Sequence, residues 1–425
     1  MKENVKEAGK DYTDEYPKWN SSMKSTHKIL IPNMLPWHFT IMEELLRAEG
    51  YDVEILKNDT RSVIDEGLKH VHNDTCYPCL CVVGQYIDAL KSGQYDLEHT
   101  AVLITQTGGG CRASNYLPLI RKAMKIEFPT VPVVSLNFSG LEKDSSFAVS
   151  KKLFLKLAFA IIYGDTVMWC YNQTKPYEVV QGAADVARDE IFAEILDKFR
   201  NGGYRKYKKI NKEIIKKFAA VERSGEKKVK VGIVGEIYVK YSELANNKLE
   251  KFLLDEGCEP VVPTLFDFIL FMALNKINDC DMYGRDKKEG FVYKLVYKLL
   301  HGMQLNVKKI FEKEGSFNPI HDIEHLRKYA DQVINQGVKM GEGWLIPAEI
   351  AAFCETGVPN VICAQPFGCL PNHIAGKGTI RTLKNMYKDE NIVAVDYDPS
   401  ATKVNQENRI KLMLATAREN LYGNG

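Results

Sequence analysis

A short apolar run leads directly into a glycine turn at Ala101-Val-Leu-Ile-Thr-Gln-Thr-Gly-Gly-Gly-Cys111. The run 101–105 is predicted to form a buried strand, and helical spacing resumes over 116–125. A further apolar run, 131–136, predicts the next strand. Because strands that alternate with helices form parallel sheets, this stretch predicts a doubly wound α/β domain.

The same alternation extends to both sides of this stretch. Toward the N-terminus, strands are predicted at 27–32 and 51–56 around a helix at 39–49. Further helices are predicted at 82–92 and 150–163. We therefore expect a first Rossmann-like domain over 27–200, preceded by a polar N-terminal arm over 1–26.

A Lys-rich segment, 201–228, is predicted to be a basic linker with an amphipathic helix at 210–221. After it the alternation restarts, and we expect a second α/β domain over 229–425 with a helical insertion near 266–338. Its predicted strands and helices lie at 229–234, 242–256, 259–263, 358–363, near 377, 392–396 and 405–422. The fold class expected is α/β, with two or three Rossmann-like (flavodoxin-like) parallel-sheet domains.

The composition is that of an ordinary globular protein. The 425 residues are 45% hydrophobic and 26% charged, with a formal net charge of only +2. No basic stripe is interleaved with aromatic residues, so nucleic acid is not an expected partner. The polar N-terminus and the interrupted apolar segments predict neither a secretory signal nor a membrane span, and we expect a cytoplasmic protein. In a reducing compartment, ten cysteines favour metal or redox use of some of them over disulfides.

Five cysteines lie in three turn-forming contexts beside Gly and Pro: Cys76, Cys79, Cys111, Cys363 and Cys369. Ligands of open parallel sheets bind outside the carboxyl ends of the strands. Cys111 follows a predicted strand, and Cys363 is the last residue of another. Cys76 and Cys79 are predicted to lie in a loop before a helix. We therefore expect these cysteines to face one inter-domain metal crevice. The backbone N–H groups of Gly108, Gly109 and Gly110 form a predicted anion-binding nest, suited to phosphate oxygens or cluster sulfides.

The cysteine patterns also allow other interpretations. Cys76 and Cys79 could form a buried structural pair, a thioredoxin-type redox pair or half of a zinc site. Cys363 and Cys369 are six positions apart, which is not the usual spacing of a zinc knuckle. The other five cysteines are assigned to the core: Cys81, Cys170, Cys258, Cys280 and Cys354. His72, His373 and Asp398 border the cysteine loops and are interpreted as turn or capping residues, with proton donation as the alternative.

Nucleotide-binding motifs do not fit. Gly376-Lys-Gly-Thr lacks the spacing of a phosphate-binding loop, and Gly232-Ile-Val-Gly-Glu236 lacks the three-glycine dinucleotide pattern. If ATP drives the chemistry of this chain, another polypeptide must hydrolyse it.

Four motifs in order carry a resemblance. They are Asn73-Asp-Thr-Cys-Tyr-Pro, Thr105-Gln-Thr-Gly-Gly-Gly-Cys-Arg-Ala-Ser-Asn-Tyr, Gly341-Glu-Gly-Trp and Gln365-Pro-Phe-Gly-Cys-Leu-Pro-Asn-His. Together they resemble the 2-hydroxyacyl-CoA dehydratase superfamily. They are most similar to its activase-related and double-cubane-type reductase proteins. The similarity runs from His27 to the closing Asp396-Tyr-Asp-Pro and Asn405-Gln-Glu-Asn-Arg.

The resemblance implies an iron–sulfur cluster held by Cys76, Cys111, Cys363 and Cys369, with Cys79 as a further candidate. The cluster would be a 4Fe-4S centre or a double-cubane 8Fe-9S centre, and the latter would also need Cys79 plus Cys81 or Cys354. The resemblance further implies a homodimer and a separate ATP-hydrolysing iron–sulfur activator that supplies low-potential electrons. The expected activity is reductive or radical dehydration chemistry on small molecules or acyl-CoA thioesters.

Two rival functions follow from the same residues. In the first, the cysteines bind structural zinc and clamp two domains of a scaffold protein. In the second, the chain is a non-metal protein that binds CoA thioesters through the Gly108 loop.

Overall fold

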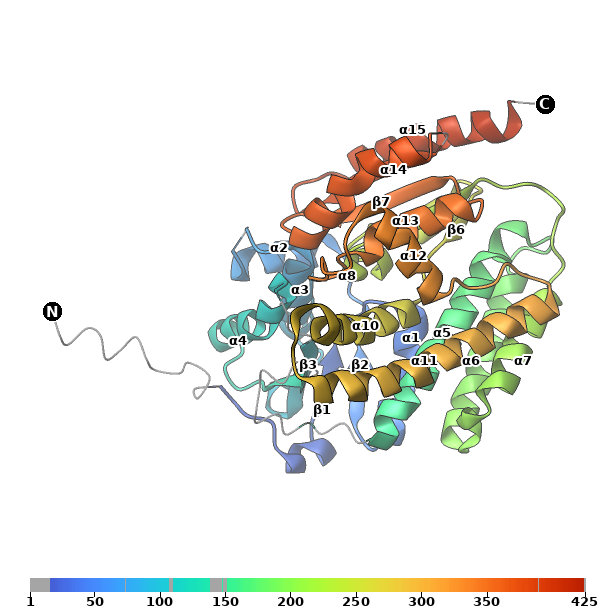
Figure 1. Cartoon of the computed structure of the whole chain (residues 1–425). Helices are drawn as coiled ribbons and strands as arrows, with labels where there is room; N and C mark the ends of the chain where they lie inside the picture. Colours follow the sequence, from blue (N-terminus) through green and yellow to red (C-terminus); the bar gives the residue numbers. More distant parts are fainter. Residues whose placement is uncertain are drawn as a thin grey trace. The chain divides into compact units, whose positions relative to one another are not determined.

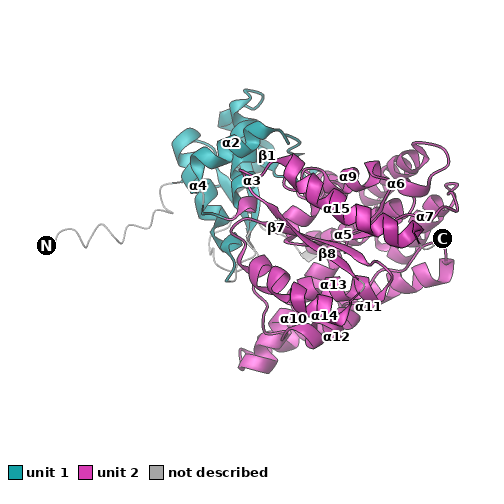
Figure 2. Cartoon of the chain, turned by 90° about the horizontal axis from the view of Figure 1, so that it is seen from above, with its two compact units in different colours: residues 1–33, 46–75, 79–150 teal, residues 34–45, 76–78, 151–425 magenta. Residues whose placement is uncertain are grey.

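The computed structural model describes residues 16–72, 74–106, 110–137, 147, 151–388 and 390–423. Figure 2 shows two compact units, each with its own parallel sheet. Unit 1 comprises residues 1–33, 46–75 and 79–150, and unit 2 comprises 34–45, 76–78 and 151–425. Most of α1 (Pro36–Ala48) and the first residues of α3 (Tyr77–Lys91) therefore pack within unit 2.

The sheet of unit 1 has the strand order β2-β1-β3-β4. Its strands are β1 (Lys28–Ile31), β2 (Asp52–Ile55), β3 (Thr100–Gln106) and β4 (Val133–Asn137), and all neighbouring pairs are parallel. The helices of this part of the chain are η3 (Ser21–Ser25), α2 (Arg61–His70), α3, η4 (Leu97–His99), η5 (Arg112–Asn115) and α4 (Tyr116–Glu127). Figure 1 shows these elements in blue to cyan.

The sheet of unit 2 has the strand order β6-β5-β7-β8. Its parallel strands are β5 (Lys230–Gly235), β6 (Glu259–Val261), β7 (Asn360–Pro366) and β8 (Asn391–Tyr397). β7 is buried along its whole length, as expected for an inner strand of a parallel sheet.

Helices make up most of the rest of unit 2. Those before β7 are α5 (Lys151–Asn172), η6 (Lys175–Tyr177), α6 (Ala183–Arg200), η7 (Gly203–Arg205), α7 (Tyr207–Ala219), α8 (Ile237–Tyr241), α9 (Leu249–Asp255), α10 (Leu265–Tyr283), α11 (Lys287–Glu314), α12 (Ile323–Val333) and α13 (Leu345–Glu355). After β7 come the π-helical turn η8 (Asn372–Gly376), η9 (Lys377–Thr379), α14 (Ile380–Met386) and α15 (Lys403–Tyr422). Helices α10 and α11 pack against each other (Figure 1).

The two sheets share one strand order. In each sheet the first strand lies between the second and the third strand. The chain therefore adds its second strand on one side of the first strand, and its third and fourth strands on the other side. The point where the strand order reverses lies between β1 and β3 in unit 1 and between β5 and β7 in unit 2. Ligands of open parallel sheets bind at this switch point. The predicted α/β class with parallel sheets is confirmed.

The predicted linker region contains one well-formed helix. α7 places Ile210, Ile214, Ile215 and Phe218 in the core, which fits the amphipathic pattern of 210–221. The domain limits 27–200, 201–228 and 229–425 stay a prediction, because packing within the structure does not show which parts fold independently.

One described helix, over 152–177, is long and apolar enough to cross a membrane. However, 83% of its apolar window is buried inside the structure. Tyr163, Met168 and Cys170, for example, are fully buried. Such burial is typical of the core helix of a soluble protein.

Gly235 at the end of β5 allows the close approach of β7. Its φ is +134°, and a Cβ at this position would lie 2.1 Å from the Ala364 carbonyl oxygen. We predict that Gly235→Ala lowers the free energy of unfolding by about 3 kcal/mol, since strain and overpacking act together. The measurement is urea unfolding followed by circular dichroism.

Gly257→Ala is the matched control, because Gly257 also has a positive φ, +74°, but an added Cβ meets nothing within 4 Å. It should lose only about 1–2 kcal/mol from its backbone conformation. Equal losses in the two variants would contradict the role assigned to the β5–β7 approach.

Candidate functional site

The switch point of unit 2 carries two of the predicted cysteines. Cys363 lies within β7 and is fully buried, and Cys369 follows the strand by three residues with an exposed fraction of 4%. A tight turn between them has Gly368 at φ +70°, where glycine is favoured.

Asn372 lies between the two thiols. Its Oδ1 is 3.9 Å from the Cys363 Sγ, and its Nδ2 donates to the Cys369 Sγ at 3.6 Å. Asn372 is itself fully buried. The structure therefore brings Cys363 and Cys369 together around one amide, which supplies an N–H donor to sulfur.

The first cysteine motif packs against the same turn of unit 2. The Tyr77 N–H donates to the Phe367 carbonyl at 3.0 Å, and the Phe367 N–H donates to the Tyr397 carbonyl at 2.8 Å. Cys76, the residue before Tyr77, is buried, with an exposed fraction of 5%. Two of the three cysteine contexts thus meet within unit 2.

The prediction that Cys79 lies in a loop is wrong. α3 begins at Tyr77, so Cys79 and Cys81 lie in its first turns, and both are fully buried. Pro78 favours this early start, because proline fits the first turn of a helix, where its missing N–H is no loss. Cys76 alone of the Cys-x-x-Cys pair precedes the helix.

Cys111 caps a short helix in unit 1. Its Sγ accepts from the Ala113 N–H at 3.5 Å at the start of η5, and the residue is half-buried. The Arg112 guanidinium donates to the Asp74 carbonyl, which places this motif beside the segment that leads to Cys76. Of the predicted glycine nest, Gly110 is exposed, and Gly108 and Gly109 lie outside the described residues.

The described part of the chain contains no group of three or more His, Cys, Asp or Glu side chains placed to hold a metal ion. The chemistry of the donors nevertheless fits a soft metal. Burial raises the pKa of the Cys363 thiol to about 12, and burial also raises the pKa of Cys369 far above its usual range. A bound metal cation removes the proton from such a thiol outright.

Sequence reasoning missed a set of buried charged residues beside this turn. Glu236 follows β5 directly, and its Oε2 accepts from the Val239 N–H at 2.9 Å. The Glu342 Oε1 accepts from the Ile237 N–H at 3.0 Å. Lys240 pairs with Glu349 at 3.1 Å, with both side chains almost fully buried.

These carboxyl groups share their electrostatic environment with Cys369. Burial and the neighbouring Glu342 raise the pKa of Glu236 to about 8, and burial raises the pKa of Glu342. After burial, Glu342 and Glu236 are the next causes of the raised pKa of Cys369. A charged residue directly after an apolar strand, as Glu236 is, was the signal available in the sequence.

The remaining predicted residues have mainly structural surroundings. The Asp398 carboxylate accepts from the Ser400 and Ala401 N–H groups at 2.7 and 2.8 Å, and His72 accepts from the Asp74 N–H at 3.2 Å. Both are thus turn residues. Cys170 and Cys258 are buried, as predicted for core cysteines, whereas Cys280 and Cys354 are only half-buried.

No protein-family model, no curated protein and no solved structure matches this chain.

The raised pKa of Glu236 predicts a pH effect on stability. Between its ordinary value of 4.5 and about 8 the folded chain binds a proton that the unfolded chain has lost, so stability falls as the pH rises through this window. Glu236→Gln removes this titration and keeps the acceptor for Val239. We predict that the variant gains stability relative to the natural chain between pH 5 and pH 8, measured by urea unfolding at both values.

Glu222→Gln, at an exposed position of unit 2, is the control and should leave the pH dependence unchanged. The prediction fails if Glu236→Gln and the natural chain lose stability in parallel over this range.

Proposed function

We propose that this chain is an iron–sulfur protein that accepts low-potential electrons from a separate ATP-dependent activator. It uses them for reductive or radical dehydration chemistry on small molecules or acyl-CoA thioesters. The observation that supports this most directly is the meeting of the Cys76 motif with the Cys363–Cys369 turn, through the hydrogen bond from Tyr77 to Phe367. These are two of the motifs that carry the resemblance to the 2-hydroxyacyl-CoA dehydratase superfamily.

The proposed ligands are Cys76, Cys363 and Cys369 of unit 2 and Cys111 of unit 1, with Cys79 as a further candidate. They would hold a 4Fe-4S cluster, or a double-cubane centre with additional thiolates, in an inter-domain crevice. When bound, such a cluster supplies one-electron chemistry at low potential. The proposal includes a homodimer and a cytoplasmic location.

The residues around the thiols have roles of their own in this proposal. Asn372 orients the sulfurs, and its N–H donation to the Cys369 Sγ would raise the potential of a group bound there. Glu236 and Glu342 lie in the same buried environment, and a carboxyl group with a pKa near 8 holds its proton at neutral pH. Glu236 can therefore keep a proton available beside the cysteine turn without exposing it to bulk water.

Removal of a ligand should abolish cluster binding while the fold survives. We predict that Cys369→Ser and Cys111→Ser each weaken iron binding by at least about tenfold, because loss of even a supporting residue costs about 10–100-fold in metal affinity. The measurement is iron, sulfide and zinc content after anaerobic purification, together with the absorption spectrum.

Cys170→Ala and Cys258→Ala are the controls, because both thiols are buried in the core away from the cysteine turns. They should keep the full metal content and lose only about 1 kcal/mol of stability. Full cluster retention in both Ser variants would remove these residues from the ligand set. Stoichiometric zinc without iron or sulfide would favour the structural zinc protein instead.

Energy coupling gives a separate prediction. The isolated chain should neither bind nor hydrolyse Mg-ATP, because its nearest match to a phosphate-binding loop, at Gly376 to Thr379, lacks the required spacing. In the structure Gly376 ends a π-helical turn, and Lys377–Thr379 form a 3-10 helix that runs into α14 instead of an open loop. Calorimetry with Mg-ATP tests this, and micromolar binding without a partner would contradict the two-component proposal.

A further inference from the structure

Unit 1 contains a groove that no step above has used. It has a volume of about 880 Å³, within the range of small-molecule sites. One wall is a face of α4 and the residues just before it, where the lining positions 115, 118, 119, 122, 125 and 126 follow helical spacing. The opposite side is formed by residues 72, 74 and 75, which lead to Cys76.

Part of the lining of the groove is apolar. Pro118, Leu119 and Ile126 line it from α4, and Tyr16 contributes a ring. Ile126 is 64% exposed, so part of this surface faces water in the structure. A ligand with an apolar or ring-shaped body would bury this apolar surface, and each Å² removed from water would contribute about 25 cal/mol to the free energy of binding.

The rim of the groove is cationic. Among the described residues, Arg112, Lys122 and Lys125 line it together with the Asp74 carboxylate, and the Lys125 ammonium lies 5.6 Å from the centre of the Tyr16 ring. The Asp74 carboxylate lies 3.4 Å from the Nδ1 of His72, which accepts from the Asp74 N–H. Lys122 forms no ion pair with the residues that the structure describes. The guanidinium of Arg112 and the ammonium of Lys122 favour an anion here.

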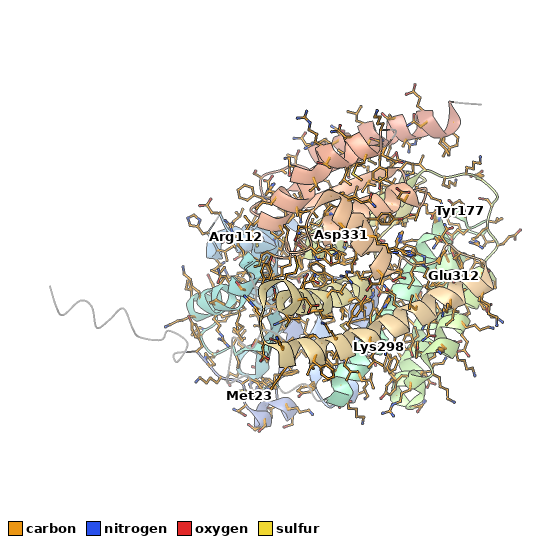
Figure 3. The ribbon with its side chains drawn as sticks, viewed as in Figure 1. Met23, Arg112, Tyr177, Lys298, Glu312 and Asp331 are labelled. Carbon is orange, nitrogen blue, oxygen red and sulfur yellow. The ribbon has the colours of Figure 1, made fainter. Side chains whose placement is uncertain are left out.

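Arg112 is the best-placed group of this rim (labelled in Figure 3). One N–H of its guanidinium donates to the Asp74 carbonyl, which holds the side chain across the groove. A guanidinium has five N–H donors, so others are available for a phosphate or carboxylate. Arg112 follows Cys111 directly, and Thr75 on the other wall precedes Cys76.

We infer that this groove binds a small organic anion, with a phosphate or carboxylate on an apolar, ring-sized body. Pro118, Leu119, Ile126 and Tyr16 receive the body, and Arg112 and Lys122 receive the charge. The groove is lined by Thr75 and Arg112, which are the sequence neighbours of the proposed ligands Cys76 and Cys111. The further step, that the bound anion is the substrate, rests on the proposed function. Binding itself does not depend on iron.

Phenyl phosphate is the test ligand, with inorganic phosphate and benzyl alcohol as its two halves. Calorimetry on the full chain should show phenyl phosphate binding at least about tenfold more tightly than either half, with affinity falling as salt is added. Lys122→Glu and Ile126→Ser should each lower the affinity for phenyl phosphate at least about fivefold. Both residues are exposed, so both variants should fold.

Lys57→Glu is the matched control, an exposed charge reversal in unit 1 outside the groove. The inference is overturned if phenyl phosphate binds no better than inorganic phosphate, if no ligand binds at millimolar concentration, or if Lys57→Glu weakens binding as much as Lys122→Glu. Phenyl phosphate binding by an anaerobically purified chain that contains stoichiometric zinc without iron or sulfide would support the groove while the metal analysis contradicts the iron–sulfur proposal, so the two failures are distinguishable.

Discussion

The contact between the end of β5 and β7 is the constraint on which the candidate site depends. Gly235 lies so close to the Ala364 carbonyl that no side chain fits between them. This approach lets the chain turn directly from β5 into α8, and it places Glu236 at the start of that helix. Gly235 pairs with Ala364 and Val234 pairs with Cys363, so Glu236 comes directly after the part of β5 that lies beside Cys363.

The shared strand order of the two sheets explains why the cysteines occur where they do. In both units the third strand lies beside the first, at the switch point, and a cysteine follows its carboxyl end in the sequence. Cys111 comes after β3 in unit 1, and Cys369 comes after β7 in unit 2. Residues beyond the carboxyl ends of strands do not have to fill the core of the sheet, so their side chains can serve a binding or chemical role.

The sequence allowed the α/β class, the parallel sheets and the position of Cys111 after a strand to be predicted, because these follow from local hydrophobic periodicity. The prediction that Cys363 closes its strand is wrong, since β7 continues, fully buried, to Pro366. The sequence also did not allow the start of α3 to be placed, since Cys76-Tyr-Pro-Cys79 has the composition of a turn and Pro78 fits the first turn of a helix equally well. The hydrogen bond from Tyr77 to Phe367 joins distant segments, and no local pattern encodes it. Glu236 and Glu342 were missed because charged residues beside glycine usually belong to solvated turns, whereas tertiary packing buries both here.

The electrostatics of the cysteine turn bear on the choice between its possible roles. A thiol that acts by itself as a nucleophile or redox group needs a lowered pKa, which cationic neighbours or a helix N-terminus provide. Cys363 and Cys369 have the opposite surroundings, because burial raises the pKa of both and the carboxyl groups of Glu342 and Glu236 add to the effect at Cys369. At neutral pH these thiols therefore stay protonated unless a cation binds them. The Cys363–Cys369 pair is therefore poorly suited to act by itself as a nucleophile or redox couple.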